Sequence, residues 1–547
     1  MFNRVFNSQA KTIGAAAGIL AISAFISRIL GLIREGLLAS AFGAGPELDS
    51  YFAAFRIPDL VYNILIAGGI VVAFLPLFSE YFAKDEKEAW RFTNNALNVF
   101  LSLLILLCLA LFAFTTPLVK LITPGFNPQQ IDLTVLLTRL MFLSPILFGL
   151  SSIFSGVLQY FNRFLVYSFC PILYNLGIIF GIIFFVPQFG VLGVALGVIL
   201  GAVLYLLIQI LPAINCGFKY SPFQLSFKDP GIKRVFILML PRIFAITGLQ
   251  INLIVITAIA STLAVGSVAI FNFANNLQNF PVGIIGVSFA VAAFPVLARA
   301  WAGAQKAEFL KSFSLIFCRI IYFIIPVSVL IFILKNQIVG IILRHGQFAP
   351  ADAQLTAASL GLFSFGILAL SLVPLLSRAF FAFQDTKTPT MVTLVAMVSN
   401  IALSFYFVWL LKTSHYFNNF LIKIFSLSYN QEIAVLGLPL AFSVGATLHC
   451  ILLMIYLYRR IGNYNLKEIG SSASKIILAS FLMALGTYLT LYFISPILDG
   501  SQAFSGFFGQ AVVAGIAAVL IYIAATFLLG SPETKFIKSK WKTLVTL

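Results

Sequence analysis

Long apolar runs recur along almost the whole chain and are separated by short polar segments. A helix that crosses a membrane needs about 20 mainly apolar residues. Turn-forming residues occupy the joining segments, as at 43–46, 124–128 and 221–222. The pattern predicts fourteen spans, at residues 13–40, 50–80, 94–118, 133–158, 165–187, 191–213, 235–260, 266–298, 312–334, 354–382, 389–411, 433–457, 474–494 and 506–529.

Composition favours a membrane protein over a chain of soluble domains. Hydrophobic residues make up 61% of the sequence and charged residues 9%, against about 25% charged in soluble domains. The mean hydropathy is +1.04. We therefore expect an all-α polytopic membrane protein with about fourteen transmembrane helices. The first apolar run is interpreted as a retained span rather than a cleavable signal peptide.

The few charges are strongly one-sided, with a net charge of +17. If the N-terminus is cytoplasmic, most basic residues fall in cytoplasmic segments. The outer loops then hold Lys120, Lys335, Arg344, Lys412 and Lys423. This positive-inside bias predicts that both termini are cytoplasmic, in a bacterial cytoplasmic membrane. Topology thus explains the basic excess, and we expect membrane lipids rather than nucleic acid as partners.

Two pairs of similar segments suggest an internal duplication. Residues 126–134 resemble 348–356, and the residues at 191–202 resemble those at 435–446. Both pairs occur at matching places, which predicts two six-helix lobes related by a parallel repeat. The expected domains are an N-lobe at 1–218, a C-lobe at 219–462, and two additional spans with a basic cytoplasmic tail at 463–547.

Transporters with parallel repeats carry their binding sites near the middle of the membrane, between the lobes. Small residues at Gly193, Gly197 and Gly201 recur at every fourth position. They allow close helix packing, and the structural interpretation is favoured for them.

Charged residues inside the first predicted span are the strongest functional signal. Arg28 falls near its centre, where an arginine costs about 2.5–3.5 kcal/mol on insertion scales. At 100° per residue, Glu35 lies about 20° from Arg28 and Arg34 about 120° from it. Such residues should face water or a partner. Glu35 could hold either arginine in place.

Arg56 is a further candidate, because it could pair with Asp59 three residues later, although Asp59 could also stabilise a helix start after Pro58. A net positive cavity suits an anionic substrate, and the planar fork of arginine can bond two phosphate oxygens at once. The alternative is a structural network of salt bridges between helices.

The opening motif resembles a known family. Residues 27–35 (Ser-Arg-Ile-Leu-Gly-Leu-Ile-Arg-Glu), 42–45 (Phe-Gly-Ala-Gly), Asp49 and 55–58 (Phe-Arg-Ile-Pro) are similar to the start of the MurJ/MviN lipid II flippases. Further similarities lie at 250–253, 280–286, 346–352 and 378–389. The resemblance implies the fold of the multidrug/oligosaccharidyl-lipid/polysaccharide exporter superfamily. It covers about the first 460 residues.

The resemblance also implies a function. It implies export of lipid II, the undecaprenyl-pyrophosphate-linked peptidoglycan precursor, by alternating access, with cavity arginines meeting the pyrophosphate. The last two helices would offer a groove for the polyprenyl tail. Arg28, Arg34, Glu35 and Asp49 match the family's charged positions. With Arg56 they form the predicted substrate-binding set.

This chain departs from the family pattern at several usually charged positions. Tyr62 and Asn63 stand where the family usually has two arginines, Ala67 replaces a carboxylate, and Asn275 and Asn276 replace an Asp-Arg pair. A flippase for another prenyl-pyrophosphate-linked saccharide therefore stays open as an alternative.

Other classes rank lower. A cation-coupled drug exporter should carry an acidic cavity, and a non-transporting cell-wall scaffold would not need the arginines. No nucleophile–base pair, phosphate loop or metal motif indicates an enzyme, and no cofactor or metal is expected. The five cysteines form no CxxC pair and the three histidines are far apart. Cell-wall synthesis proteins are possible partners of a flippase.

Overall fold

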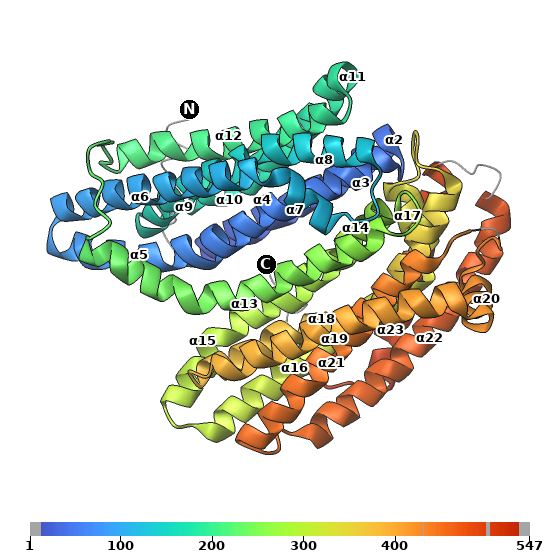
Figure 1. The fold of residues 1–547 in the computed structure, drawn as a ribbon. Coiled ribbons are helices and arrows are strands. Elements are labelled where there is room, and N and C mark those ends of the chain that lie inside the picture. The colour runs from blue at the N-terminus through green and yellow to red at the C-terminus, as the bar shows by residue number, and fades with distance from the viewer. Residues whose placement is uncertain (1–12, 430, 499–503, 535–547) are drawn as a thin grey trace. The chain divides into compact units, whose positions relative to one another are not determined.

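The computed structural model describes residues 13–429, 431–498 and 504–534. Regular structure in these ranges is entirely helical, without strands (Figure 1). Eleven helices in the described ranges are long and apolar enough to cross a membrane. The prediction of an all-α polytopic membrane protein is confirmed.

Each of the eleven helices coincides with a predicted span. They lie at Glu86–Ala113, Pro128–Tyr160, Phe164–Phe189, Val191–Asn215, Ser267–Ala302, Lys306–Ile333, Pro350–Ala382, Lys387–Thr413, Ala434–Ile461, Leu466–Ile497 and Phe504–Leu528. The predicted spans 13–40, 50–80 and 235–260 are not among them. The total of fourteen therefore stays a prediction.

The chain forms two compact units, one ending at Ala269 and the other beginning at Ile270. α14 (Ser267–Pro281) begins in the first unit and continues into the second. The other helices of the first unit are α2 (Ile13–Phe42), α3 (Pro46–Ala54), α4 (Arg56–Val61), η1 (Tyr62–Ile70), α5 (Val71–Lys84), α6 (Glu86–Ala113), α7 (Thr115–Ile122), α8 (Pro128–Met141), α9 (Leu143–Tyr160), α10 (Phe164–Phe180), η2 (Gly181–Phe185), α11 (Val186–Phe189), α12 (Val191–Asn215) and α13 (Pro230–Ser261).

The remaining helices belong to the second unit, which includes the two helices predicted to be additional. They are η3 (Val282–Val287), α15 (Ser288–Ala302), α16 (Lys306–Ile333), α17 (Lys335–Ile342), α18 (Pro350–Ala382), α19 (Lys387–Thr413), α20 (His415–Phe425), η4 (Ala434–Leu436), α21 (Gly437–Ile461), α22 (Leu466–Leu498) and α23 (Phe504–Leu528). α22 packs on α16 and on α23. The predicted lobes, bounded at 218 and 462, and the duplication behind them stay predictions.

The predicted second span is not one continuous α-helix. Residues 50–80 are divided among α3, α4, a π-helical stretch (η1) and α5. Pro58 lies inside α4 and Pro76 inside α5. Proline removes a backbone donor and disturbs the preceding turn, which favours such breaks. As a result, Arg56 stands at the start of a new short helix.

A glycine seam joins α10, η2 and α12. A Cβ atom at Gly177 would lie 2.3 Å from the Gly201 Cα, and one at Gly181 would lie 2.5 Å from the Gly197 Cα. A Cβ at Gly193 would lie 2.5 Å from the backbone of Phe185. Only glycine lets the two backbones approach this closely. The predicted close packing is confirmed.

Candidate functional site

Arg34 and Glu35, which are neighbours on α2, form an ion pair through Arg34 Nη2 and Glu35 Oε1. Arg34 Nη1 donates a hydrogen bond of 3.2 Å to Asn175 Oδ1 on α10. The Glu35 side chain is 3% exposed, whereas that of Arg34 is 24% exposed. The guanidinium is therefore held from two sides, while about a quarter of the side chain as a whole stays exposed.

Asn175 ties α2 to α10. Its Nδ2 donates to the Ser27 carbonyl at 3.2 Å, to Ser27 Oγ at 3.1 Å and to the Pro171 carbonyl at 3.1 Å. One turn of helix earlier on α2, Ser23 Oγ donates to Ser168 Oγ at 3.1 Å. These contacts fix the face of α2 that carries Arg34. Sequence reasoning missed Asn175, although an amide inside an apolar span is a recognisable signal.

Arg28 lies two turns before Glu35 on α2 and is half-buried. Sequence geometry left open which arginine Glu35 holds. The structure pairs Glu35 with Arg34. The second carboxylate oxygen of Glu35 and Arg34 Nε are buried and make no hydrogen bond within the described residues.

Arg56 is buried, at 9% exposure, at the start of α4. Its Nε donates to Thr257 Oγ1 on α13 at 2.7 Å. Arg56 and Asp59 interact electrostatically. The Arg56 side chain thus links α4 to α13 inside the first unit.

Asp49 on α3 holds the beginning of α14. Its Oδ2 accepts from the Gly266 amide at 2.6 Å and its Oδ1 from the Ala269 amide at 2.8 Å. Asp49 is 2% exposed. A carboxylate at a helix N-terminus satisfies orphan amides and complements the helix dipole. This is a structural task, and direct contact between Asp49 and a substrate stays a prediction.

A cavity of about 210 Å³ lies in the first unit. Its polar lining consists of Asp59, Tyr62, Ser144, Tyr174 and Tyr205. Tyr174 and Asp59 both interact electrostatically with Arg34. Tyrosine hydroxyls and a carboxylate therefore accompany the predicted arginine, and sequence reasoning did not bring them together.

The departures from the family pattern have partners of their own. The Tyr62 ring packs edge-on against Phe148, with centroids 5.1 Å apart. Asn63 Nδ2 donates to the Asp59 carbonyl at 2.9 Å. Asn275 Oδ1 accepts from Gln278 Nε2 at 3.0 Å, and Asn276 is half-buried. The side chain of Ala67 lies outside the described part.

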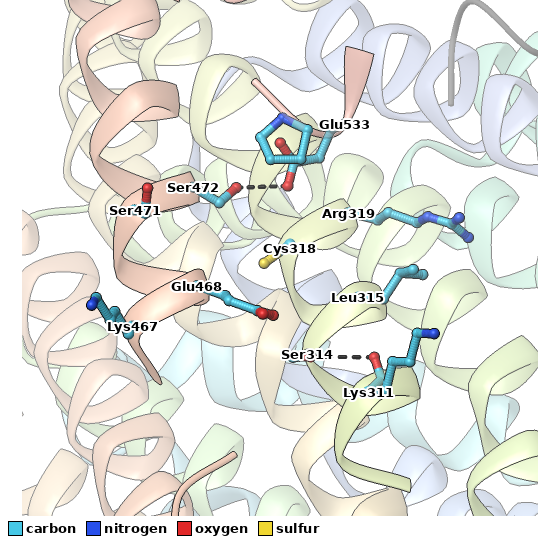
Figure 2. A pocket seen from close by; sticks show the side chains of 11 residues that line it. Lys311, Ser314, Leu315, Cys318, Arg319, Lys467, Glu468, Ser471, Ser472 and Glu533 are labelled. Carbon is cyan, nitrogen blue, oxygen red and sulfur yellow. Dashed lines mark hydrogen bonds between the residues drawn. The ribbon is translucent and has the colours of Figure 1, made fainter. Parts of the chain in front are cut away.

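A second, larger cavity of about 890 Å³ lies within the second unit, between α16, α22 and the residues that follow α23 (Figure 2). Its charged lining consists of Lys311, Arg319, Lys467, Glu468 and Glu533. Figure 2 shows Glu533 bonded to Ser472, whose Oγ donates to Glu533 Oε1 at 2.6 Å. Sequence reasoning missed this cavity, because its residues come from segments far apart in the chain.

Metal-ligand chemistry is not indicated in the described ranges. No group of three or more His, Cys, Asp and Glu side chains there could hold a metal ion. The five cysteines are all free, and all but Cys216 are buried.

The fold matches solved transporter structures. The structure of lipid II flippase MurJ in an inward closed conformation aligns over 95% of this chain and 99% of its own, with a TM-score of 0.76 and 24% identity. An inward-facing multidrug resistance MATE family transporter of the MOP superfamily aligns over 80% and 95%, with a TM-score of 0.66 and 16% identity. At these identities the likeness defines the fold alone. The chain thus shares the all-helical fold of these two solved membrane proteins.

Sequence comparison identifies the family. The family model "Lipid II flippase MurJ" matches residues 38–507. A probable lipid II flippase MurJ of Buchnera aphidicola is 31% identical over 386 residues, covering 70% of this chain and 75% of the relative. One from Rhizobium tropici is 28% identical over 533 residues, covering 94% of each chain. The chain belongs to the lipid II flippase MurJ family, as the opening motif indicated.

Proposed function

We propose that this chain moves lipid II across the membrane and that Arg34, with Arg28, contacts the pyrophosphate of the lipid. The observation that carries the proposal is the geometry of Arg34. Its guanidinium is anchored by Glu35 and Asn175, yet 24% of the side chain stays exposed. An arginine fork held in this way can bond two phosphate oxygens at once. Anchoring in advance lowers the entropy that binding would otherwise cost.

The charge balance supports an anionic ligand. Glu35 offers one oxygen to Arg34 and is itself almost fully buried, so the accessible charge in this part of α2 is that of the arginines. Arg28 adds a second, half-buried cation on the same helix. Arg56 is directed to Thr257 instead, and we assign it a supporting role. It adds positive potential near Asp59 without bonding the ligand directly.

Transport would proceed by alternating access, with the arginines open first to one side of the membrane and then to the other. The positive-inside bias supports cytoplasmic termini. In this proposal the lipid is loaded from the cytoplasmic side. A bacterial cytoplasmic membrane is the corresponding location, and cell-wall synthesis enzymes would receive the lipid outside.

A second candidate is transport of another prenyl-pyrophosphate-linked saccharide. The specific observation in its favour is the fate of the two positions that are usually arginine. Tyr62 packs on Phe148 and Asn63 bonds the Asp59 backbone, so neither adds a cation. The pyrophosphate would still meet Arg28 and Arg34, while the saccharide would meet a less charged surface.

The test places this chain in a bacterium depleted of its own lipid II flippase and measures lipid II accessible at the outer face. The wild-type chain should restore it. A hydrogen bond to a charged group is worth about 1.5–3 kcal/mol, so Arg34→Ala should lower the flipping rate roughly 10- to 100-fold. Arg34→Lys should recover only part, because lysine lacks the fork.

Arg299→Ala is the matched control, since Arg299 is exposed and donates to the Pro295 carbonyl within its own helix. This variant should behave as wild type. Full activity of well-inserted Arg34→Ala would refute the role of Arg34. A well-inserted wild-type chain that leaves lipid II inaccessible would refute lipid II as the substrate and favour another lipid-linked saccharide.

A further inference from the structure

The segment at residues 219–228, which joins α12 to α13, is neither helix nor strand. We call it the strap. Three asparagines lie on two successive turns of α6, namely Asn94, Asn95 and Asn98. Their exposed fractions are 6% or less. All three point their amides at the strap backbone, so the strap is held although it lacks regular structure.

Asn94 and Asn95 each bond the strap twice. Asn94 Nδ2 donates to the Lys219 carbonyl at 2.9 Å, and the Ser221 amide donates to Asn94 Oδ1 at 2.8 Å. Asn95 bonds both the carbonyl and the amide of Ser226, at 3.1 Å and 2.6 Å. Each side chain thereby imitates a neighbouring strand, because it serves one donor and one acceptor of the same stretch of backbone.

Asn98 fastens the middle of the strap. Its Nδ2 donates to the carbonyls of Ser221 and Gln224, both at 2.9 Å, and its Oδ1 accepts from Tyr220 Oη at 3.1 Å. A segment with so many buried partners is ordered. The direction of its outward side chains is therefore set by the fold and not by chance.

Those outward side chains are large and apolar. Phe223 is 96% exposed, Tyr220 55%, Leu225 50% and Phe227 48%. Single exposed apolar residues are ordinary, but a contiguous group marks an interaction surface. Lys219 and Lys228, at the two ends of the strap, are also exposed.

The strap lies at the level where α6 changes from polar to apolar. Residues 86–98 of α6 carry all of its charged and amide side chains, whereas Ser102 is the only polar residue of 99–113. α6 is one of the eleven helices that are long and apolar enough to cross a membrane. Asn98, at the boundary, therefore places the strap beside the interface of the membrane with water. Aromatic residues are enriched at that level, and basic side chains there attract anionic headgroups.

We propose that the strap is a membrane anchor. Tyr220, Phe223, Leu225 and Phe227 insert into the headgroup layer of the adjoining leaflet, and Lys219 and Lys228 bind anionic lipid phosphates. The asparagines of α6 supply the rigid mount. The strap would thus hold the connection between α12 and α13 at a constant depth while the rest of the chain works.

The test uses an environment-sensitive nitrobenzoxadiazole label at Phe223→Cys, in a background whose five native cysteines are replaced by alanine. The purified chain is reconstituted in liposomes of phosphatidylethanolamine with phosphatidylglycerol. The label should emit at shorter wavelength than the same label at Lys306→Cys, an exposed position in the first turn of α16. Lipids with a nitroxide at shallow depth should quench the label at position 223 at least twofold more strongly than the label at position 306.

Two further measurements separate the contributions. Lys219→Gln with Lys228→Gln should remove the dependence of the quenching on phosphatidylglycerol content. The double variant Asn95→Ala with Asn98→Ala should reduce the quenching of the label at position 223. This comparison uses protein whose thermal midpoint stays within a few degrees of that of the parent. Water-like emission at position 223 in liposomes would overturn the proposal. So would a label that is shielded only in native membranes, because that result would assign the surface to a protein partner.

Discussion

Arg34 and Asn175, which lie 141 residues apart in the sequence, are joined by a hydrogen bond of 3.2 Å between Nη1 and Oδ1. Asn175 also bonds Ser27, in the same helix as Arg34. One amide therefore sets both the packing of α2 on α10 and the direction of the candidate arginine. If Arg34 contacts the ligand as proposed, Asn175 couples stability to ligand contact.

Replacing Asn175 by alanine should damage both properties. The change leaves Arg34 Nη1 and the two Ser27 oxygens without their amide partner. A buried polar group left unpaired costs about 1–3 kcal/mol. We expect a lower thermal midpoint in detergent and a loss of lipid II accessibility at the outer face that exceeds the loss of folded protein.

Gln129→Ala is the control for this experiment, because Gln129 is exposed in the first turn of α8. It should change neither quantity. If Asn175→Ala lowers flipping only in proportion to the amount of folded protein, the amide has a packing role alone, and the positioning of Arg34 by Asn175 is refuted.

The glycine seam predicts steric sensitivity. Gly201→Ala would bring its new Cβ to 2.6 Å from the Tyr174 carbonyl oxygen on α10, and a backbone atom cannot move aside cheaply. Overpacking of this kind typically costs about 1–3 kcal/mol. The monodisperse fraction in size-exclusion chromatography and the thermal midpoint should both fall.

Gly515→Ala on α23 provides the opposite expectation. No atom lies within 4 Å of a Cβ built at Gly515, and alanine is favoured over glycine inside a helix by about 1 kcal/mol. This variant should be as stable as wild type or more stable. Equal stability of the Gly201→Ala and Gly515→Ala variants would contradict the close approach of α10 and α12.

Substitutions of Asp49 should lower the thermal stability in graded steps. Both carboxylate oxygens accept backbone amides at the start of α14. Asp49→Ala removes both acceptors, and leaving buried amides unpaired costs about 1–3 kcal/mol. Asp49→Asn keeps one acceptor oxygen and should lose less. Glu47→Gln, at an exposed position of α3, should be neutral in thermal unfolding. A full loss of flipping by a stable Asp49→Asn protein would instead support substrate contact.

The fold class followed from the sequence because apolar runs of membrane-crossing length survive in the structure as helices. The break of span 50–80 did not follow, because a hydropathy pattern does not separate an α-helix from a π-helical stretch or a proline kink. In the second unit, the 890 Å³ cavity depends on how α16 meets α22, which periodicity cannot supply.

The candidate site was predictable in its charges and not in its contacts. Helical geometry placed Arg34 and Glu35 on α2 and left two partners open for Glu35. Glu35 pairs with its neighbour Arg34, whereas the anchoring amide of Asn175 and the bond from Arg56 to Thr257 are tertiary contacts. No local rule encodes these two tertiary contacts, since they join side chains that lie 141 and 201 residues apart in the sequence.

Asp385, in the loop between α18 and α19, should make stability depend on pH. Burial alone would raise its pKa, but hydrogen bonds from the Thr388 amide at 3.0 Å and Thr388 Oγ1 at 2.7 Å hold the pKa below the ordinary value. A lowered pKa in the folded state gives stability that is complete above the unfolded pKa, about 3.9, and is lost as the pH falls through the folded pKa. The thermal midpoint of the wild type should therefore be higher than that of Asp385→Asn at pH 7. The difference between the two midpoints should shrink steadily below about pH 4. Glu432→Gln, an exposed loop variant, serves as control, and a difference that grows on acidification would contradict the assignment.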